Sequence, residues 1–384
     1  MGMTKPAVKL WPNTTGRQTG KRAFALPDQP MQRRILLVLD YRGLFRQDIS
    51  RNHGIRTETM IDIFRKSGFE VVTTTYDELV NGTKGVNSYI SSFVVYTGSE
   101  SMTYKSYIED VAYLLGRDNV LLPSYELLKA HEDKLFAQLL LDTKPKPKAS
   151  HALPAIGITT YADLLRHLKD LEYPVVVKSA VGSGSIGVRK ADSEAKLKRI
   201  FRQMASKEEL IVYYLKYLYK RLQRKDLSEY IKDEKWFGKV LLQRYVPDME
   251  DDWKVLAFGE KFYVLNRKVR KNDFRASGSG IFLFNKAPRE LLDAADECYR
   301  NMDVPILSMD FCMDRQRNVY LIEYQSVHFG PYTLIKSESY YVKDSDGWRE
   351  IRGKSDLATE YALAIVGYIE RKHFAPREAP WEGN

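Results

Sequence analysis

The chain has 384 residues, of which 44% are hydrophobic and 12% aromatic, and it carries a formal net charge of +10. This apolar content is enough to bury a large core, so we expect a globular protein of two or three packed units. Cys298 and Cys312 are its two cysteines, which excludes a disulfide framework and a four-ligand zinc site built on them. The cysteine content therefore favours a reducing, cytoplasmic compartment.

The two ends of the chain and its charge narrow the class of protein further. Residues 1–30 are polar and lack the apolar stretch of a signal peptide, so we expect a flexible tail there and a second one at 376–384. No apolar run is long enough to cross a membrane. The positive charge fits nucleic acid, a membrane surface or an acidic substrate. No nucleic-acid motif accompanies it, so we expect no nucleic-acid partner.

Residues 31–123 alternate between strand and helix patterns. The apolar run at 35–39 is typical of a strand buried on both faces, and helical spacing follows at 57–67. Further elements are expected as strands at 71–72, 92–96 and 120–122 and as a helix at 104–116. This order predicts an open α/β domain.

The middle of the chain begins with residues 124–141, which we expect to form one long helix. The Lys-Pro alternation at 144–148 breaks regular structure and marks a boundary near residue 150. From 193 to 239 the pattern is helical and strongly charged, with an apolar stripe at Ile211, Leu215, Leu218 and Leu222. We expect this stripe to pack on a neighbouring domain, and a partner helix is the alternative.

A lysine at the end of an apolar strand precedes a loop of small residues. The strand at 175–178 ends with Lys178, and the loop contains Ser183, Gly184 and Ser185. Glycines let backbone N–H groups approach phosphate oxygens, and the lysine adds a point charge. The lysine precedes the glycines, so this is not a Walker loop, and the spacing is not that of a Rossmann motif. The segment fits a nucleotide's phosphates, with a plain hairpin turn as the alternative.

Two strands expected at 306–313 and 319–324 each carry one carboxylate in an apolar run, Asp310 and Glu323. As an antiparallel pair, the strands would let both carboxylates converge on Mg²⁺, with the Gln325 amide oxygen as a third ligand. The alternative is one solvent-facing acid on each strand. Acids that interrupt apolar runs are costly unless they have a partner, so we favour the metal site.

A basic segment lies between the glycine loop and the carboxylates. Lys254 lies on a strand expected at 253–258, and residues 266–280, after a strand at 261–265, include Arg267 and Arg275. Fixed cations of this kind can stabilise a transferred phosphate and the charge of an acyl-phosphate. A solvated loop is the alternative. A closing helix is expected at 356–372.

In this order the elements resemble the ATP-grasp superfamily over residues 34–334. The motifs Asp252-x-Lys254 and Phe274-Arg275-x-Ser277 resemble those of its glutathione-synthetase and ribosomal-protein-glutamate-ligase branches. The resemblance implies an α/β (α+β) ATP-grasp fold with an N-terminal Rossmann-like pre-ATP-grasp α/β domain. It divides the chain into that domain at 31–123 and an ATP-grasp domain at 124–375, with a lid subdomain at about 150–245 and a C-terminal subdomain at about 246–375.

The resemblance also implies roles for individual residues. Two lysines would contact the nucleotide phosphates, Lys134 and Lys178, with Ser183, Gly184 and Ser185 as the lid. The adenine would be held by the backbone of a hinge that includes Gln243, Arg244, Tyr245 and Val246, and the nearby acid Glu250 would bind the ribose. Mg²⁺ or Mn²⁺ would be held by Asp310, Glu323 and Gln325. The catalytic cations would be Arg275, Arg267 and Lys254.

The reaction implied is phosphorylation of a carboxylate by ATP, followed by attack of an amine on the acyl-phosphate. The chain is then expected to be a cytoplasmic, biosynthetic C–N ligase with small-molecule carboxylate and amine substrates, and homodimers occur in this family. Gln325 and Ser277 stand where the family has Asn, so the substrate stays open. For His328, three residues after Gln325, the alternatives are a substrate contact, a base and a structural, hydrogen-bonded histidine. The alternatives are an ATP-grasp kinase that phosphorylates a hydroxyl and a non-catalytic, ATP-binding regulatory or scaffold protein.

Overall fold

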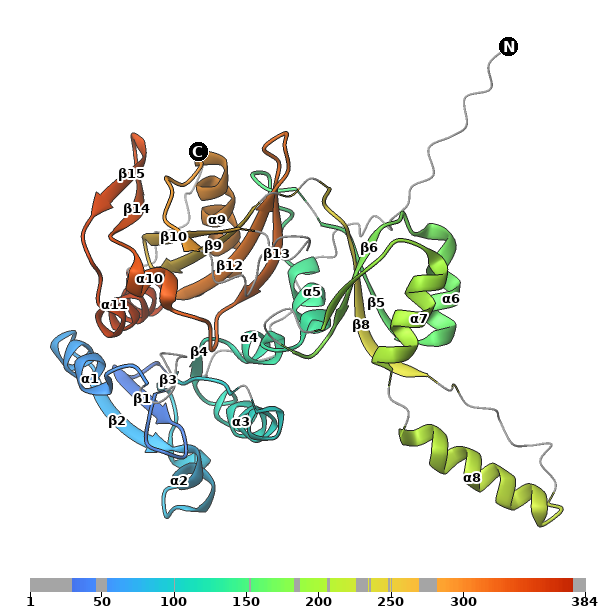
Figure 1. Ribbon diagram of the computed structural model, residues 1–384. Helices are drawn as coiled ribbons and strands as arrows, with labels where there is room; N and C mark the ends of the chain where they lie inside the picture. Colours follow the sequence, from blue (N-terminus) through green and yellow to red (C-terminus); the bar gives the residue numbers. More distant parts are fainter. Residues whose placement is uncertain are drawn as a thin grey trace, which may run out of the picture. The chain divides into compact units, whose positions relative to one another are not determined.

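The computed structural model describes residues 30–45, 54–99, 101–151, 153–182, 187–205, 208–225, 234, 236–247, 249, 251–268 and 282–375 (Figure 1). The chain divides into two compact units. The described part of unit 1 lies within 132–139 and 153–247, and that of unit 2 lies within 30–131, 140–152 and 248–375.

The first layer of unit 2 is a parallel sheet of four strands in the order β2-β1-β3-β4. Its strands are β1 (Arg34–Leu39), β2 (Glu70–Thr75), β3 (Phe93–Val95) and β4 (Val120–Leu122). The helices between and after them are α1 (Thr57–Lys66), α2 (Tyr76–Asn81), the short η2 (Val86–Ser88), α3 (Met102–Leu115) and α4 (Tyr125–Ala130). This alternation confirms the open α/β arrangement expected for residues 31–123.

The second layer of unit 2 is an antiparallel sheet in the order β13-β12-β9-β10-β14-β15, with β11 paired to β10. Its strands are β9 (Asp251–Phe258), β10 (Lys261–Lys268), β11 (Phe282–Leu283), β12 (Ile306–Met313), β13 (Val319–Gln325), β14 (Ser339–Asp344) and β15 (Gly347–Arg352). The helices are α9 (Arg289–Met302), α10 (Tyr332–Lys336), α11 (Leu357–Ile369) and a final π-helical turn (Glu370–Phe374). The sequence patterns predicted β9, β10, β12, β13 and α11 but missed α9 and the β14–β15 hairpin.

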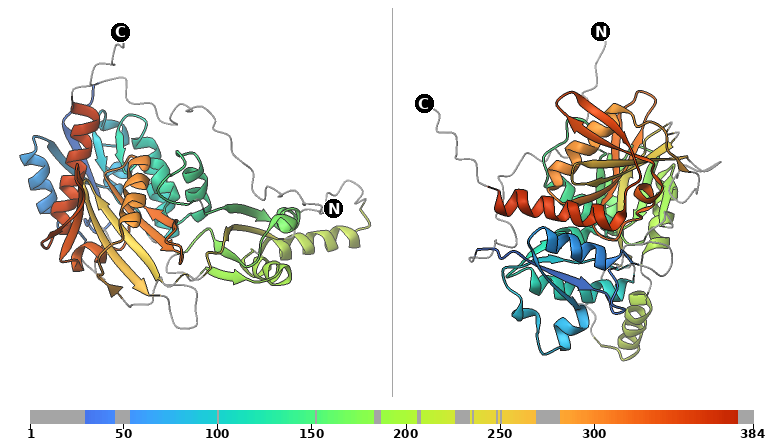
Figure 2. Two further views of the ribbon diagram at one scale, coloured as in Figure 1. Left: turned by 90° about the horizontal axis from the view of Figure 1, so that it is seen from above. Right: turned by 90° about the vertical axis from the view of Figure 1, so that its left-hand side faces the viewer.

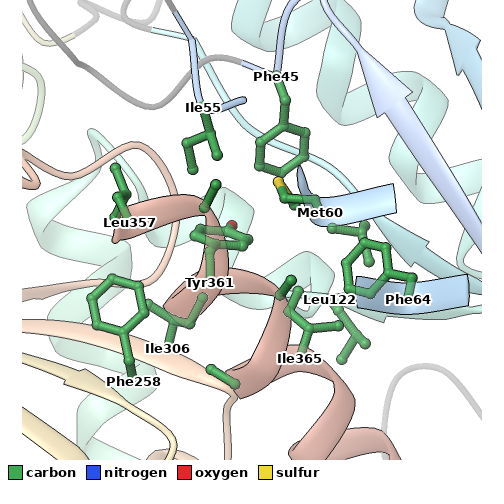
Figure 3. Packing of buried hydrophobic residues seen from close by; sticks show 14 of the residues in the cluster. Phe45, Ile55, Met60, Phe64, Leu122, Phe258, Ile306, Leu357, Tyr361 and Ile365 are labelled. Atoms are coloured by element: carbon green, nitrogen blue, oxygen red, sulfur yellow. The ribbon is translucent and has the colours of Figure 1, made fainter. Parts of the chain in front are cut away.

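Helix α11 joins the two layers of unit 2. It carries Leu357, Tyr361 and Ile365, which are buried in one apolar cluster with residues of α1 and of both sheets (Figure 3). The right-hand view of Figure 2 shows this red helix running between the blue parallel layer and the orange antiparallel layer. Tyr361 and Ile365 are each about 1% exposed, so α11 is a central core element of the unit.

Unit 1 is an antiparallel sheet with helices packed on both faces. Its strands follow the order β5-β8-β6-β7 and are β5 (Ala155–Thr160), β6 (Val175–Ser179), β7 (Val188–Ala191) and β8 (Phe237–Arg244). Its helices are α5 (Lys134–Asp142, the first part of which lies in this unit), α6 (Tyr161–His167) with a short extension η3 (Leu168–Asp170), α7 (Glu194–Met204) and α8 (Glu208–Leu222). Side chains of α6, α7, β6 and β8 form the unit's main core.

The long helix expected at 124–141 is wrong, because the structure ends α4 at Ala130 and begins α5 at Lys134. Glu132 adopts a left-handed backbone conformation with φ +58°, which an α-helix does not tolerate. Asp133 then starts the next helix, because its carboxylate accepts a hydrogen bond from the Phe136 N–H at 3.0 Å. The break puts Lys134 in the first turn of a new helix rather than in the middle of a long one.

The helical pattern read at 193–239 is also wrong at its end. The structure has two helices there, α7 and α8, and β8 begins at Phe237. Charged and apolar residues alternate along much of this stretch. Such a local pattern does not show where a helix ends and a strand begins, because the strand's pairing partners are distant in sequence. Among the described residues, no helix is both long and apolar enough to span a membrane.

Candidate functional site

A row of charged side chains crosses the antiparallel sheet of unit 2. Asp310 on β12 lies opposite Glu323 on β13 and opposite Lys254 on β9. Directly opposed residues on neighbouring antiparallel strands project from the same face of a sheet. The three predicted site residues therefore stand side by side on one face, across three consecutive strands.

Arg267 and Asp252 extend this row into an ion-pair cluster. The two are register partners on β10 and β9, and Arg267 Nε donates to Asp252 Oδ1 at 2.5 Å. The other side of the guanidinium lies 3.0 Å from Asp310, measured from Nη2 to Oδ2. Lys254 Nζ donates to the remaining oxygen of Asp310, Oδ1, at 3.2 Å. Two carboxylates and two cations are thus interleaved, and Arg267 bridges the two acids.

The pKa values of the two aspartates move in opposite directions. Burial raises the pKa of Asp252 to about 6, and this outweighs the attraction of Arg267. Burial also acts to raise the pKa of Asp310, but the attraction of Arg267 and Lys254 wins and lowers it to about 2. The pKa of the Arg267 guanidinium is raised, because the two aspartates overcome its own burial. Asp310 is therefore firmly anionic at neutral pH.

The strand pattern explains why these charges gather at one end of the sheet. On β9, Lys254, Leu256 and Phe258 point to one face, because side chains alternate along a strand. Leu256 and Phe258 belong to the core cluster that includes Tyr361 of α11. The same face is thus apolar where α11 packs on it and charged further along the strands.

Glu323 and Gln325 form the outer end of the row. Gln325 Nε2 donates to Glu323 Oε1 at 3.1 Å, and both side chains are partly exposed. Two carboxylates and an amide are oxygen donors of the kind that Mg²⁺ prefers, and this ion usually completes its shell with water and substrate phosphates. In the part of the chain that the structure describes, no three His, Cys, Asp or Glu side chains form a metal-binding group. Asp310, Glu323 and Gln325 therefore fit a Mg²⁺ site only if water and substrate phosphates supply most of the ion's ligands.

In unit 1, Lys178 lies on the face of the sheet away from the main core. Val175 and Val177 are buried against α6 and α7, whereas Lys178 projects to the opposite face. There, Leu135 of α5 packs with Ala180 and Leu241 in a smaller apolar cluster. Lys178 is only 5% exposed, so a cation is buried at the end of β6, directly before the glycine-rich loop.

Lys134 is tied to the same loop from α5. Its backbone N–H donates to the Ala180 carbonyl at 2.9 Å, and its ammonium donates to the carbonyl of Gly182. Gly182 has φ +118°, a conformation that favours glycine. Both predicted phosphate-binding lysines of unit 1 thus lie at the start of the loop, whereas Ser183, Gly184 and Ser185 lie outside the described residues.

The predicted hinge follows β8. Gln243 is buried in the strand between Ala155 and Val176, and Arg244 is exposed at the strand end. Tyr245 receives the Lys190 ammonium over its ring at 5.0 Å, and Val246 is partly buried just beyond the strand. Two further predicted site residues, Glu250 and Arg275, lie outside the described residues.

No site role was assigned from the sequence to two acidic residues near the predicted site residues, Asp252 and Asp133. Asp252 was noticed in the sequence as part of a motif, but its pairing with Arg267 was not. Its signal was an acid two residues before Lys254 in an apolar strand, which places both on one face. Asp133 was missed as the cap of α5 and as the ion-pair partner of Lys239.

His328, for which the sequence left a substrate contact, a base or a structural role open, is buried in unit 2. It is 5% exposed, and its ring centroid lies 5.8 Å from that of His131. The backbone of His328 has φ +49°, the left-handed region. The structure therefore places His328 just after β13 with its ring against that of His131.

Comparisons with known proteins show what the fold resembles. No family model matches the chain. A curated protein, urea amidolyase of Lachancea kluyveri, is 44% identical over 50 residues, which is 13% of this chain and 3% of that protein. The chain therefore spans only a small fraction of this relative.

Solved structures match over most of the chain. The ADP complex of an N5-carboxyaminoimidazole ribonucleotide synthetase superposes with a TM-score of 0.50 at 12% identity, covering 90% of this chain and 78% of that one. The ADP complex of the Staphylococcus aureus N5-carboxyaminoimidazole synthetase gives 0.50 at 11% identity, covering 89% and 79%. These matches confirm the predicted mixed α/β fold: the chain shares the architecture of these two synthetases.

Proposed function

We propose that the chain is an ATP- and Mg²⁺-dependent ligase that activates a carboxylate as an acyl-phosphate and joins it to an amine. The observation that carries this proposal is the row formed by Lys254, Asp310 and Glu323, with Arg267 ion-paired to Asp310. Charges that are partly or fully buried on a sheet face are costly to place and contribute little to stability as such. A role in binding or catalysis explains why these charged side chains lie there. The fold supports the proposal that this role is in ATP-dependent ligation.

In this proposal the cations of unit 2 stabilise negative charge. Arg267 is fixed by two carboxylates, and Lys254 by one, so both can meet charge that develops on a phosphoryl or acyl oxygen without first reorganising. Asp310, Glu323 and Gln325 would hold Mg²⁺, which when bound neutralises phosphate charge. Because both oxygens of Asp310 already accept from cations, Glu323 is the ligand that this arrangement favours first.

Unit 1 would supply the nucleotide-binding residues. Lys134 and Lys178 would bind phosphate oxygens, together with Ser183, Gly184 and Ser185, and the hinge Gln243, Arg244, Tyr245 and Val246 would hold adenine, with Glu250 at the ribose. Arg275 would act with Arg267 on the transferred phosphate. We place the reaction in the cytoplasm, since a chain with only two cysteines is typical of a reducing compartment.

The test is turnover on defined substrate pools. The protein is incubated with ATP, Mg²⁺, pools of amino acids or uronic acids, and amines, and ADP, phosphate and the coupled product are followed by mass spectrometry. A ligase releases ADP and free phosphate together with a condensed product. A phosphorylated product without free phosphate would instead identify a kinase, and ATP binding without turnover on any pool would favour a regulatory protein.

Asp310→Asn tests the metal-binding part of the proposal. We expect turnover to fall by about a hundredfold or more, because a buried charge that positions the metal and two cations is lost. Calorimetry with and without Mg²⁺ measures whether the Mg²⁺-dependent part of ATP binding falls with it. Unchanged turnover and unchanged Mg²⁺ dependence would reject Asp310 as a ligand. If calorimetry finds no ATP binding to the wild-type chain at all, the whole proposal is rejected.

A further inference from the structure

Helix α8 of unit 1 exposes a row of large apolar side chains. Val212, Leu215, Tyr219 and Leu222 are 53%, 60%, 63% and 81% exposed. Their spacings of three and four residues place them along one side of the helix. Leu215 and Leu222 belong to the stripe that the sequence pattern predicts to pack on a neighbouring domain, but in the structure both are exposed.

The preceding helix shows that such exposure is not general in unit 1. Helix α7 is also strongly amphipathic, and its Leu197, Ile200 and Phe201 are 0–4% exposed within the core of the unit. Its polar face points outward, as expected for a helix on a sheet. The open stripe of α8 is therefore a surface that its own unit does not cover.

The charge around the stripe is of one sign. Between residues 210 and 225 the sequence has no Asp or Glu and has five cations: Lys216, Lys220, Arg221, Arg224 and Lys225. The acids Glu208 and Glu209 are confined to the first turn, where they favour the helix N-terminus. Side-by-side packing of two such helices would bring these cations together, which disfavours a second copy as the occupant.

One tyrosine, Tyr214, lies between the apolar and cationic sides. Tyr214 is 56% exposed, and it precedes Leu218 by four residues and Arg221 by seven, so it lies between them on the helix surface. A tyrosine with an apolar ring and a polar hydroxyl is suited to the boundary between hydrocarbon and water. A nucleic-acid surface would match the cations but would leave the aliphatic residues exposed.

We propose that α8 binds the surface of a membrane rich in anionic lipid, lying in the plane of the interface. Its apolar side would enter the boundary between headgroups and acyl chains, and its cations would face the lipid phosphates and carboxylates. The contact is peripheral, in keeping with the absence of a membrane-spanning helix among the described residues. It is a surface separate from the charged row of unit 2, so its test does not depend on turnover.

The experiment is co-sedimentation of the full-length protein with vesicles. Vesicles of phosphatidylcholine alone are compared with vesicles that contain about one third phosphatidylserine, at low and high salt. We expect binding to the anionic vesicles, little binding to the neutral ones, and loss of binding at high salt. No sedimentation with anionic vesicles at low salt overturns the proposal.

Two double variants assign the contact to α8. Lys216→Gln with Arg221→Gln removes two cations and should weaken binding about 25-fold, since each cation near an anionic surface strengthens it about fivefold. Leu215→Gln with Leu222→Gln should weaken binding by at least about tenfold through lost apolar burial. Glutamine keeps a high helix propensity, and circular dichroism checks that the fold is retained.

The matched control is Leu165→Gln with Lys169→Gln, which changes an exposed leucine and an exposed lysine on and next to α6 in the same unit. We expect this control to bind vesicles like the wild type. If the α8 variants and the control sediment alike, the assignment to α8 is wrong. If the wild type fails to bind vesicles but forms a dimer, or binds RNA, and the α8 variants lose that property, the membrane proposal is overturned in favour of that partner.

Discussion

The two predicted site regions of the chain hold their cations in different ways. In unit 2, Arg267 lies between Asp252 and Asp310, so its charge is balanced by carboxylates that the fold itself supplies. In unit 1, the Lys134 ammonium is bound by the carbonyl of Gly182, which is polar but carries no net charge. Among the described residues no carboxylate pairs with the Lys134 ammonium, whereas Arg267 belongs to a preassembled cluster with its own carboxylates.

The two arrangements contribute to different properties, one to stability and the other to the binding of ATP. A balanced buried cluster is fixed in place at a large desolvation cost, and removing one member leaves its partners without compensation. A lysine held by a carbonyl can transfer its hydrogen bonds to a phosphate at little structural cost. We therefore expect changes in unit 2 to affect stability strongly and changes in unit 1 to affect mainly the binding of ATP.

The largest effect is expected for Arg267→Met. The change leaves Asp252 and Asp310 buried side by side without their shared cation, so the free energy of unfolding should fall by about 3–5 kcal/mol. Urea unfolding monitored by circular dichroism measures this. The control is Arg317→Met, which removes an exposed cation from a surface pair with Glu290 and should cost less than about 1 kcal/mol. Equal losses for both variants would show that the cluster contributes no more to the free energy of unfolding than an exposed ion pair does.

The pH dependence of stability sharpens the comparison within unit 2. Since burial raises the pKa of Asp252 from an ordinary 3.8 to about 6, the folded chain keeps a proton there that the unfolded chain has released. Its contribution to stability is full below about pH 4 and is lost as the pH rises through about 6.

The variant Asp252→Asn removes this titration. We expect the wild type to lose up to about 3 kcal/mol more stability than the variant between pH 4 and pH 6.5, because one unit of pKa shift is worth about 1.4 kcal/mol. Urea unfolding at several pH values gives the difference. A difference that stays constant, or that grows in favour of the wild type as the pH rises, would show that Arg267 rather than burial controls Asp252.

A moderate effect is expected in unit 1 for Lys178→Met. The Kd for ATP should rise about 10- to 100-fold through loss of a charged contact to phosphate. Calorimetry measures the Kd, and a thermal melt checks that the fold is kept. Lys198→Met, on helix α7 of the same unit, is the matched control, because its ammonium pairs with Glu194 rather than with a residue of the proposed nucleotide site. An unchanged Kd for Lys178→Met would remove this lysine from the proposed nucleotide site.

The smallest effect is expected for Asp133→Ala. Its carboxylate caps α5 through the Phe136 N–H, so the loss should lower the free energy of unfolding by about 1 kcal/mol. Because α5 positions Lys134, the Kd for ATP should rise only a few-fold. Asp133→Asn is the conservative variant and should restore most of the stability, since asparagine is also a good cap. A loss as large as that of Arg267→Met would contradict the contrast between the two regions.

The sequence by itself determined the features that depend on neighbouring residues. The apolar run ending in Lys178 predicted β6, and the turn between two apolar strands predicted the β12–β13 hairpin that places Asp310 opposite Glu323. Alternation along each strand also fixed which side chains share a face. These features depend on residues that are close together in the chain, so their pattern can be recognised in the sequence.

The remaining features depend on long-range packing. The ion pair between Arg267 and Asp310 exists because β9 lies between β10 and β12 in the sheet, and no periodicity in the sequence encodes that strand order. The break before Lys134 depends on the left-handed backbone at Glu132, and the exposure of Leu215 depends on which surfaces are left uncovered. Local patterns report which face of an element is apolar, whereas long-range packing decides what that face meets.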